Sequence, residues 1–372
     1  MHWQIQNHLN SLEIVKLDNS QRLYKWLLAS LVFTYSLIFV GGLVRVSGSG
    51  MGCPDWPTCF GKLIPPTSIE QISWHPQAEF EVGDMIVHNG TLWVSDFNFT
   101  TLAFFGSENW HPYEKHNYAK FNVMHTWIEY FNRLFGVTTG LVITMAMLFS
   151  LLIRKRFPKV VVATLIAFLL TGVEGWMGAK VVESNLAPIV ITLHMLLALI
   201  IVSLLIYALL KVKLNTQSST LQTSYASQIP LYLKILWGVT VFEILLGTHM
   251  RGGLEDLRIA FPDRTVDFLM TTLGTFKYIH TGMGILLVSL TAILWNKIMM
   301  HSTPSTSVII LMRSLLGLFI FQVGMGELMV FGEFSPSFRL LHMWGASLSI
   351  GVIMAIFMYI EHVQKDRNVN IF

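Results

Sequence analysis

The chain has 372 residues, of which 53% are hydrophobic and only 13% are charged, and its formal net charge is +3. Soluble domains carry about 25% charged residues, so this composition excludes an ordinary soluble enzyme as well as a disordered or collagen-like chain. The basic residues are scattered and the net charge is small, which argues against nucleic-acid binding. The composition is typical of a protein embedded in a lipid bilayer.

Eight apolar stretches are long enough to cross a membrane, since a spanning helix needs about 20 apolar residues. The sequence therefore predicts an all-α polytopic membrane protein with eight transmembrane helices. In chain order the predicted spans are residues 24–46, 124–153, 159–181, 188–210, 231–250, 276–296, 308–330 and 338–360.

Lys and Arg residues gather on one side of this eight-span topology. An even number of spans places both termini on one side, and the positive-inside rule makes the basic side cytoplasmic. No cleavable signal is evident, so we expect the first span to be a permanent anchor. We expect an integral protein of the bacterial inner (plasma) membrane with both termini cytoplasmic. The basic residues are Lys16, Arg22, Lys25, Arg154, Lys155, Arg156, Lys159, Lys211, Lys213, Lys234, Lys297, Arg313, Lys365 and Arg367.

An internal repeat relates the two halves of the chain. Asn132 and His194 are 62 positions apart, and the same spacing separates His280 and His342, which lie 148 positions further along. The repeat predicts two pseudo-symmetric four-helix bundles that run in the same direction through the membrane. Position 280, a histidine, has its counterpart at position 132, which is an asparagine.

We divide the chain at the ends of the predicted bundles. The N-terminal half includes an extracytoplasmic loop, residues 47–120, which is much longer than its counterpart in the C-terminal half. We expect its excess, residues 67–118, to form a small outer subdomain of unknown task. The predicted segments are a cytoplasmic N-terminal segment 1–23, the N-terminal half 24–211, a cytoplasmic linker 212–230, the C-terminal half 231–361 and a cytoplasmic tail 362–372.

Ionisable residues inside membrane spans are costly and by default mark a functional site. His280 and His342 come from two helices of one predicted bundle and lie at similar depth. Two such imidazoles suit the axial positions of a haem iron, whereas zinc needs further ligands for which no suitable spacing is present. One such histidine taken alone is as often a simple interior hydrogen-bonding residue, but the repeated spacing favours a haem site.

The N-terminal half keeps only one histidine of the pair, because Asn132 stands at the position that matches His280. Asparagine is a poor iron ligand, so this site has one imidazole, His194, and an open face that would suit a transiently bound substrate. Glu129 shares a helical face with Asn132, which makes it an acid–base candidate. The alternative is that Glu129 forms only a structural ion pair, with Arg133 or with a histidine.

Cys53 and Cys59 are the only cysteines of the chain, and five residues separate them in the outer loop. That loop faces the oxidising side of the membrane, where a disulfide is expected to form and persist. The alternative is a pair of free thiols. The sequence does not distinguish a structural disulfide from a redox-active one.

Three features of the sequence resemble the haem A synthase family. They are the segment GGLVRVSGSGMGCPDWPTCFGKLIPP at residues 41–66, the EYFNR at residues 129–133, and the four-helix repeat with its histidines. The resemblance covers nearly the whole membrane portion, and the cysteine-bearing loop is its most specific motif. It implies a membrane oxidoreductase that oxidises a ring methyl of haem O to a formyl group, which gives haem A for terminal oxidase biogenesis.

The resemblance also implies roles for individual residues. His280 and His342 would hold a haem b cofactor, and Glu129 would be the family's essential glutamate. Cys53 and Cys59 would be its loop cysteine pair. Haem O would bind in the N-terminal half as the substrate.

Asn132 departs from the family pattern, because many members have a histidine at this position. We therefore expect His194 alone to ligate the iron of the substrate haem, with Asn132 as a hydrogen-bonding neighbour. His125 cannot substitute for the missing ligand, since it lies about 10 Å along the helix from Asn132.

Arg45 and Arg251 end the first and fifth spans and are candidates for pairing with haem propionates. The alternative is that these side chains only snorkel to the membrane interface. Lys180 and Arg339 are open to the same two interpretations. His249 has no counterpart in the first span, so we assign it no ligand role.

Haem O is the expected substrate, membrane lipid surrounds the protein, and haem O synthase or oxidase assembly factors are candidate partners. The sequence identifies no electron acceptor. The alternative function is a di-haem membrane electron carrier of the cytochrome b type, which should keep both histidine pairs intact. A transporter with inverted repeats is less consistent with the sequence, because the two predicted halves run parallel.

Overall fold

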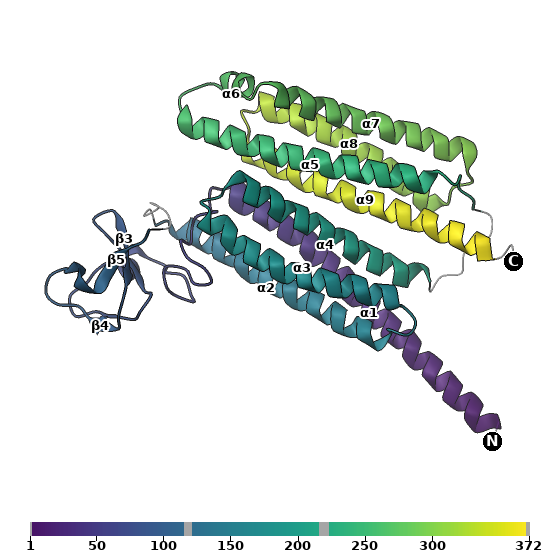
Figure 1. Cartoon of the computed structure of the whole chain (residues 1–372), viewed down its shortest axis with the longest axis horizontal. Coiled ribbons are helices and arrows are strands. Elements are labelled where there is room, and N and C mark those ends of the chain that lie inside the picture. The colour runs from purple at the N-terminus through teal and green to yellow at the C-terminus, as the bar shows by residue number, and fades with distance from the viewer. Residues whose placement is uncertain (1, 115–120, 216–222, 370–372) are drawn as a thin grey trace.

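The computed structural model describes residues 2–114, 121–215 and 223–369. They form a bundle of long helices with a small β subdomain at one end (Figure 1). Eight helices of the described residues are long and apolar enough to cross a membrane, which confirms the predicted all-α polytopic fold. The predicted loop 47–120, the linker 212–230 and the tail 362–372 each lie partly outside the described residues.

The predicted spans correspond to long helices, and the first helix extends well beyond the apolar stretch that predicted it. The N-terminal half contains α1 (His2–Val46), α2 (Val123–Leu152), α3 (Pro158–Glu183) and α4 (Pro188–Leu214). The C-terminal half contains α5 (Ile229–Ala260), the short α6 (Val266–Thr272), α7 (Thr275–His301), α8 (Thr306–Phe331) and α9 (Pro336–Val369).

The starting residues of α4 and α9 determine how far along the bundle axis the predicted ligands lie. α4 begins at Pro188 and α9 at Pro336, where the missing backbone N–H costs no helical hydrogen bond. His194 and His342 each follow six positions later, so they come at the same height in equivalent helices. At the start of α2, the Asn122 side chain caps the helix by accepting a hydrogen bond from the backbone N–H of His125 at 3.1 Å.

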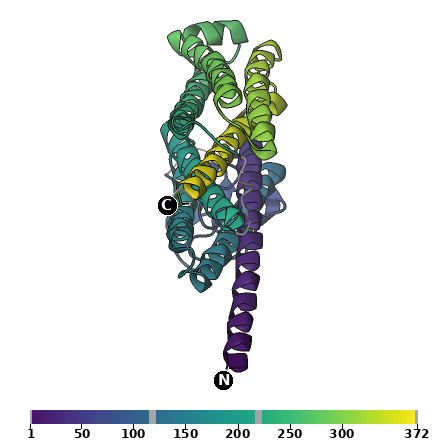
Figure 2. The ribbon, with the colours of Figure 1, turned by 90° about the vertical axis from the view of Figure 1, so that its right-hand side faces the viewer.

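Within each half the helices form a closed ring of contacts. In the N-terminal half α1 packs on α2, α2 on α3, α3 on α4 and α4 on α1; in the C-terminal half the order α5, α7, α8, α9 repeats this ring. The halves meet through α4 with α9, α1 with α9 and α4 with α5. Figure 2 shows the C-terminal half, in green and yellow, beside the N-terminal half. The arrangement is consistent with the predicted duplication.

Both chain ends lie at one end of the bundle, and the β subdomain and α6 lie at the other (Figure 1). We call these the terminal end and the loop end. Each half has a buried apolar core toward the terminal end, and the predicted histidines are not part of either core. Lipid is as apolar as these side chains, so the cores stabilise the halves mainly by close van der Waals packing. Core residues include Leu27, Ile143 and Leu205 in one half and Leu233, Leu294 and Ile356 in the other.

The predicted outer subdomain is built of short antiparallel strands, which the sequence analysis did not anticipate. One sheet has the order β2-β3-β5 and the other pairs β1 with β4. A two-residue turn, Asn89 and Gly90, joins β2 to β3, and both residues have positive φ, as this type of tight hairpin turn requires. The elements are η1 (Ile69–Ile72), β1 (Glu79–Phe80), β2 (Met85–His88), β3 (Thr91–Ser95), β4 (Phe99–Thr100), η2 (Ser107–Asn109) and β5 (Trp110–Pro112).

Gly252 allows α5 of the C-terminal half to approach the start of α4 of the N-terminal half. A Cβ atom at this position would lie 2.4 Å from Cβ of Pro188. We expect Gly252→Ala to lower the free energy of unfolding in detergent by about 1–3 kcal/mol, because the two helices must separate. Thermal unfolding measures the change. Gly238→Ala on the same helix is the control, since nothing lies within 4 Å of its added Cβ. A Gly252→Ala midpoint equal to the control's would contradict the prediction.

Candidate functional site

The structure brings His280 of α7 and His342 of α9 together inside the C-terminal half. Their ring centres are 6.2 Å apart and the ring planes are inclined by 72°. Two imidazoles that share a metal have ring centres about 6 Å apart, because each metal–nitrogen bond is about 2 Å long. Among the described residues, no group of three or more His, Cys, Asp or Glu side chains could hold a metal ion. A haem iron needs only two axial side chains, and the spacing of this pair fits that requirement.

His280 and His194 each have a carboxylate beside Nδ1. Glu243 Oε1 of α5 lies 2.7 Å from His280 Nδ1, and Glu174 Oε2 of α3 lies 3.1 Å from His194 Nδ1. Carboxylates in this position orient metal-binding imidazoles, because they contact one ring nitrogen and leave the other for the metal. In both histidines, Nε2 is the nitrogen left to face a ligand.

His342 has an amide in place of the carboxylate. The side-chain amide of Gln322 on α8 lies 3.1 Å from His342 Nδ1 and 2.7 Å from the His342 carbonyl oxygen. Gln322 lies 148 positions after Glu174, the offset that also relates His342 to His194. The two halves therefore place equivalent polar side chains beside equivalent histidines.

Sequence reasoning missed Glu174, Glu243 and Gln322. A signal for the two glutamates was present, since each lies inside a predicted span, where an ionisable residue marks a functional site by default. For Gln322 the signal was its place in the repeat. What the sequence did not supply was the contact itself, which depends on packing between helices far apart in the chain.

Asn132 occupies the position in the N-terminal half that His280 occupies in the C-terminal half. The His280 ring lies against Gly247, whose Cβ position would be 2.9 Å from Cε1, and Asn132 Oδ1 lies 3.9 Å from the Cβ position of Gly41. Asn132 Oδ1 is buried and has no hydrogen-bond partner. A buried unsatisfied polar group costs about 1–3 kcal/mol, so this atom marks a place for a polar ligand.

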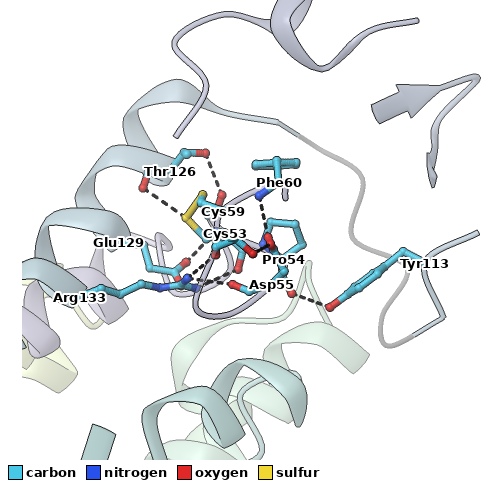
Figure 3. A network of polar contacts seen from close by, with 11 residues as sticks. Cys53, Pro54, Asp55, Cys59, Phe60, Tyr113, Thr126, Glu129 and Arg133 are labelled. Atoms are coloured by element: carbon cyan, nitrogen blue, oxygen red, sulfur yellow. Dashed lines mark hydrogen bonds and ion pairs between the residues drawn. A yellow bond between two sulfur atoms is a disulfide. The ribbon is translucent and has the colours of Figure 1, made fainter. Parts of the chain in front are cut away.

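Both carboxylate oxygens of Glu129 have donors (Figure 3). The Cys53 backbone N–H donates to Oε2 at 2.9 Å, and Arg133 Nη2 donates to Oε1 at 2.6 Å. The Glu129 residue is only 4% exposed. The ion pair with Arg133 that we gave as the alternative is therefore present, and an acid–base role for Glu129 stays a prediction.

Cys53 and Cys59 form a disulfide, as we expected from the predicted place of the loop. The bond lies against α2, with Cys53 Sγ 3.7 Å from the carbonyl oxygen of Thr126 (Figure 3). Thr126 is one helical turn from Glu129. The disulfide thus packs against α2 one turn from the predicted catalytic carboxylate.

Two side chains anchor the loop between the cysteines. Arg133 Nη1 donates to the carbonyl oxygens of Asp55 and Thr58, both at 2.8 Å. From the other side, the Tyr113 hydroxyl donates to the Pro54 carbonyl oxygen at 2.7 Å. The Arg133 hydrogen bonds hold the loop on α2, the Tyr113 hydrogen bond links it to the segment after β5, and neither involves a sulfur atom.

Arg45 of α1 and Arg251 of α5, the predicted propionate partners, meet at the loop end. Both pair with Glu255: Arg45 Nη2 contacts Oε2, and Arg251 Nη2 lies 3.2 Å from Oε1. Lys180 instead pairs with Glu183 at 2.6 Å. The His249 ring packs on Phe276, with ring centres 5.9 Å apart.

A family model described as "Cytochrome oxidase assembly protein" (COX15-CtaA) matches residues 24–87 and 107–354. These ranges include every predicted site residue. Residues 88–106, which form part of the β subdomain, fall between the two matched segments.

Three curated relatives named "Heme A synthase" are similar to the chain. The Shewanella oneidensis protein is 27% identical over 223 residues, which cover 60% of this chain and 55% of that protein. The Rickettsia felis protein is 27% identical over 239 residues, or 61% of each chain. The Wolbachia pipientis wMel protein is 25% identical over 295 residues, or 73% of this chain and 76% of the relative. The chain thus matches less than two thirds of the length of the first two.

Burial raises the pKa of Tyr113 to about 12, and the negative charges of Asp55 and Glu183 add to the effect. Its folded-state pKa is above the ordinary value of 10.0, so the stability from the protonated phenol is complete below pH 10 and is lost as the pH rises through about 12. We expect the tyrosinate absorbance of wild type minus Tyr113→Phe to show one group that titrates near pH 12. A difference that titrates near pH 10 would contradict the prediction.

Proposed function

Because the chain belongs to the cytochrome oxidase assembly protein family COX15-CtaA, we propose that it is a haem A synthase. The enzyme would oxidise a ring methyl of haem O to a formyl group and so supply haem A for terminal oxidases. The observation that carries the proposal is the close pair of His280 and His342 in one half, with a single histidine, His194, at the matching place in the other. The name of the curated relatives supports the choice of reaction.

The C-terminal half would hold a resident haem b on His280 and His342. The 6.2 Å between their ring centres supports this, as does the Glu243 carboxylate beside Nδ1 of His280. A bound haem supplies one-electron chemistry that no side chain of the chain can provide. The role of His280, His342 and Glu243 would be to bind and orient it.

The N-terminal half would receive haem O. His194 would be its iron ligand, and Glu174 Oε2 lies 3.1 Å from Nδ1 of that histidine. Asn132 Oδ1, which is buried without a partner, would accept a hydrogen bond from a donor on the opposite face of the haem. One protein ligand in place of two suits a group that must leave as product, because a second imidazole would hold the iron more firmly.

Glu129 would accept a proton during the oxidation, because converting a methyl to a formyl group releases protons. Its two donors, Cys53 N–H and Arg133 Nη2, fix the carboxylate in place before any substrate binds. Protonation of Oε1 would require the hydrogen bond from Arg133 to weaken. The Arg133 side chain could then keep its two hydrogen bonds to the loop carbonyls.

We propose that the protein lies in the bacterial inner (plasma) membrane with its terminal end in the cytoplasm. The basic residues of the α2–α3 turn, among them Arg154 and Lys155, are on the same side of the bundle as the chain ends, and the positive-inside rule supports this orientation. Haem O synthase or oxidase assembly factors would be its protein partners.

Site variants expressed with a source of haem O test the proposed function. We expect His280→Ala and His342→Ala to lose haem b from the purified protein, because each removes an axial ligand. Glu129→Gln should retain haem b, and its rate of haem A formation should fall by at least about 100-fold, as expected for loss of a positioned acid–base group. Pyridine haemochrome spectra and chromatography of extracted haems measure both quantities.

His249→Ala is the matched control, because His249 contacts Phe276 and should leave haem b in place. Retention of haem b by both ligand variants would overturn the assignment of the cofactor site. Wild-type protein that binds two haem b groups and forms no haem A would instead be an electron carrier of the cytochrome b type.

Asn132→His tests the single-ligand substrate site. A second imidazole opposite His194 should convert the substrate iron to a six-coordinate, low-spin state, which electron paramagnetic resonance of the haem O complex detects. Asn132→Leu, which removes Oδ1 and adds no ligand, is the control. An Asn132→His spectrum identical to that of the wild-type complex would count against the arrangement.

A further inference from the structure

A cluster of half-buried arginines lies between the two halves at the loop end. Arg45 comes from α1, Arg251 from α5 and Arg339 from α9, and Arg45 and Arg251 both pair with Glu255. Arg339 lies within electrostatic reach of Glu255, Arg45 and Arg258. We call Arg45, Arg251, Arg339 and Glu255 the junction cluster.

The junction cluster carries more positive than negative charge. It contains three guanidinium groups and one carboxylate, and the Nε atoms of Arg45, Arg251 and Arg339 are buried without a hydrogen-bond partner. Arg45 and Arg251 expose only 14% and 22% of their side chains. Buried charge that is not paired is strongly unfavourable, so the excess positive charge of the cluster favours binding of a further anion.

In the C-terminal half, the cluster lies one helical turn from the histidine pair. Gly247, whose Cβ position is 2.9 Å from His280, precedes Arg251 by four residues on α5. On α9, Arg339 precedes His342 by three residues. Residues three or four apart share a helical face, so both arginines stand just beyond the two rings, toward the loop end.

The N-terminal half has the same arrangement on α1. Gly41 lies next to Asn132 Oδ1, and Arg45 follows Gly41 by four residues. Arg45 therefore stands one turn beyond the proposed substrate site, as Arg251 stands one turn beyond the proposed cofactor site. Glu255 links these two arginines across the boundary between the halves.

We propose that the junction cluster is one carboxylate-binding site shared by both haems, at which propionates of haem b and of haem O bind side by side. The proposal rests on the proposed function. Guanidinium groups bind carboxylates through paired, charge-assisted hydrogen bonds, and the unpartnered Nε atoms provide donors for them. Arg339 and Glu255 join Arg45 and Arg251 in this role, with Glu255 as the carboxylate common to the two sites.

A shared site has a consequence that two separate sites would lack. Arg45 belongs to the substrate half, yet its charge would act on haem b through the common cluster. Removing a positive charge near a haem favours its ferric form and lowers its midpoint potential, and removing a negative charge does the opposite. A substitution in one half should therefore change the potential of the haem in the other half.

The experiment is a redox titration of haem b in the purified full chain, without added haem O. We expect Arg45→Gln to shift the midpoint potential of the bound haem b downward and Glu255→Gln to shift it upward, each measured on the fraction of protein that holds haem b. Arg45→Lys, which keeps the charge, should stay close to wild type. Lys180→Gln is the control, because it removes a cation at the same end that pairs with Glu183 instead.

The results separate this inference from the proposed function. Wild-type protein without haem b would overturn the proposed function before any variant is measured. Haem b with the same potential in wild type, Arg45→Gln and Glu255→Gln would overturn the shared site and leave the proposed function standing. If Arg45→Gln does not fold, Arg251→Gln tests the same coupling from the other half, because a shared site requires it to lower the midpoint potential of added haem O; an unchanged haem O potential would overturn the shared site.

Discussion

A polar side chain inside a membrane must find a partner within the protein, and the arrangement of this structure follows from that constraint. The buried carboxylates do not stand alone: Glu174 and Glu243 lie beside histidines, and Glu129 and Glu255 pair with arginines. Among the described residues, several buried polar atoms that lack a hydrogen-bond partner lie at the proposed haem sites. They include Asn132 Oδ1 and the three arginine Nε atoms of the junction cluster. A carboxylate-bearing ligand would accept hydrogen bonds from the three Nε–H groups, whereas Asn132 Oδ1 needs a donor.

The two halves share one ring of helix contacts and differ at the positions that set their chemistry. His280 corresponds to Asn132, and Gln322 corresponds to Glu174. The first difference gives one half two imidazoles and the other half one. Gene duplication followed by such changes would let one bundle retain a permanent cofactor while its copy binds a transient one.

The sequence was sufficient to predict the eight spans, because a long apolar run reports directly on contact with lipid. It did not predict that α1 begins at His2, since hydropathy detects the apolar part of a helix and not its polar extension. The strands of the outer subdomain were not predicted, although Asn89-Gly90 is a strong hairpin signal. The partners of the histidines were out of reach, because Glu174 and Glu243 meet them only after separate helices pack together.

The anchoring of the cysteine loop by Arg133 and Tyr113 affects how its sulfur atoms would behave if the bond were cut. Neither anchor uses a sulfur atom: Arg133 of α2 and Tyr113, which follows β5, both bind backbone carbonyls between the two cysteines, so these contacts do not depend on the bridge. Two thiols kept in this way would have a high effective concentration toward each other. When an external two-electron oxidant re-forms the bond, only a local rearrangement of two side chains would be needed, with little loss of chain entropy.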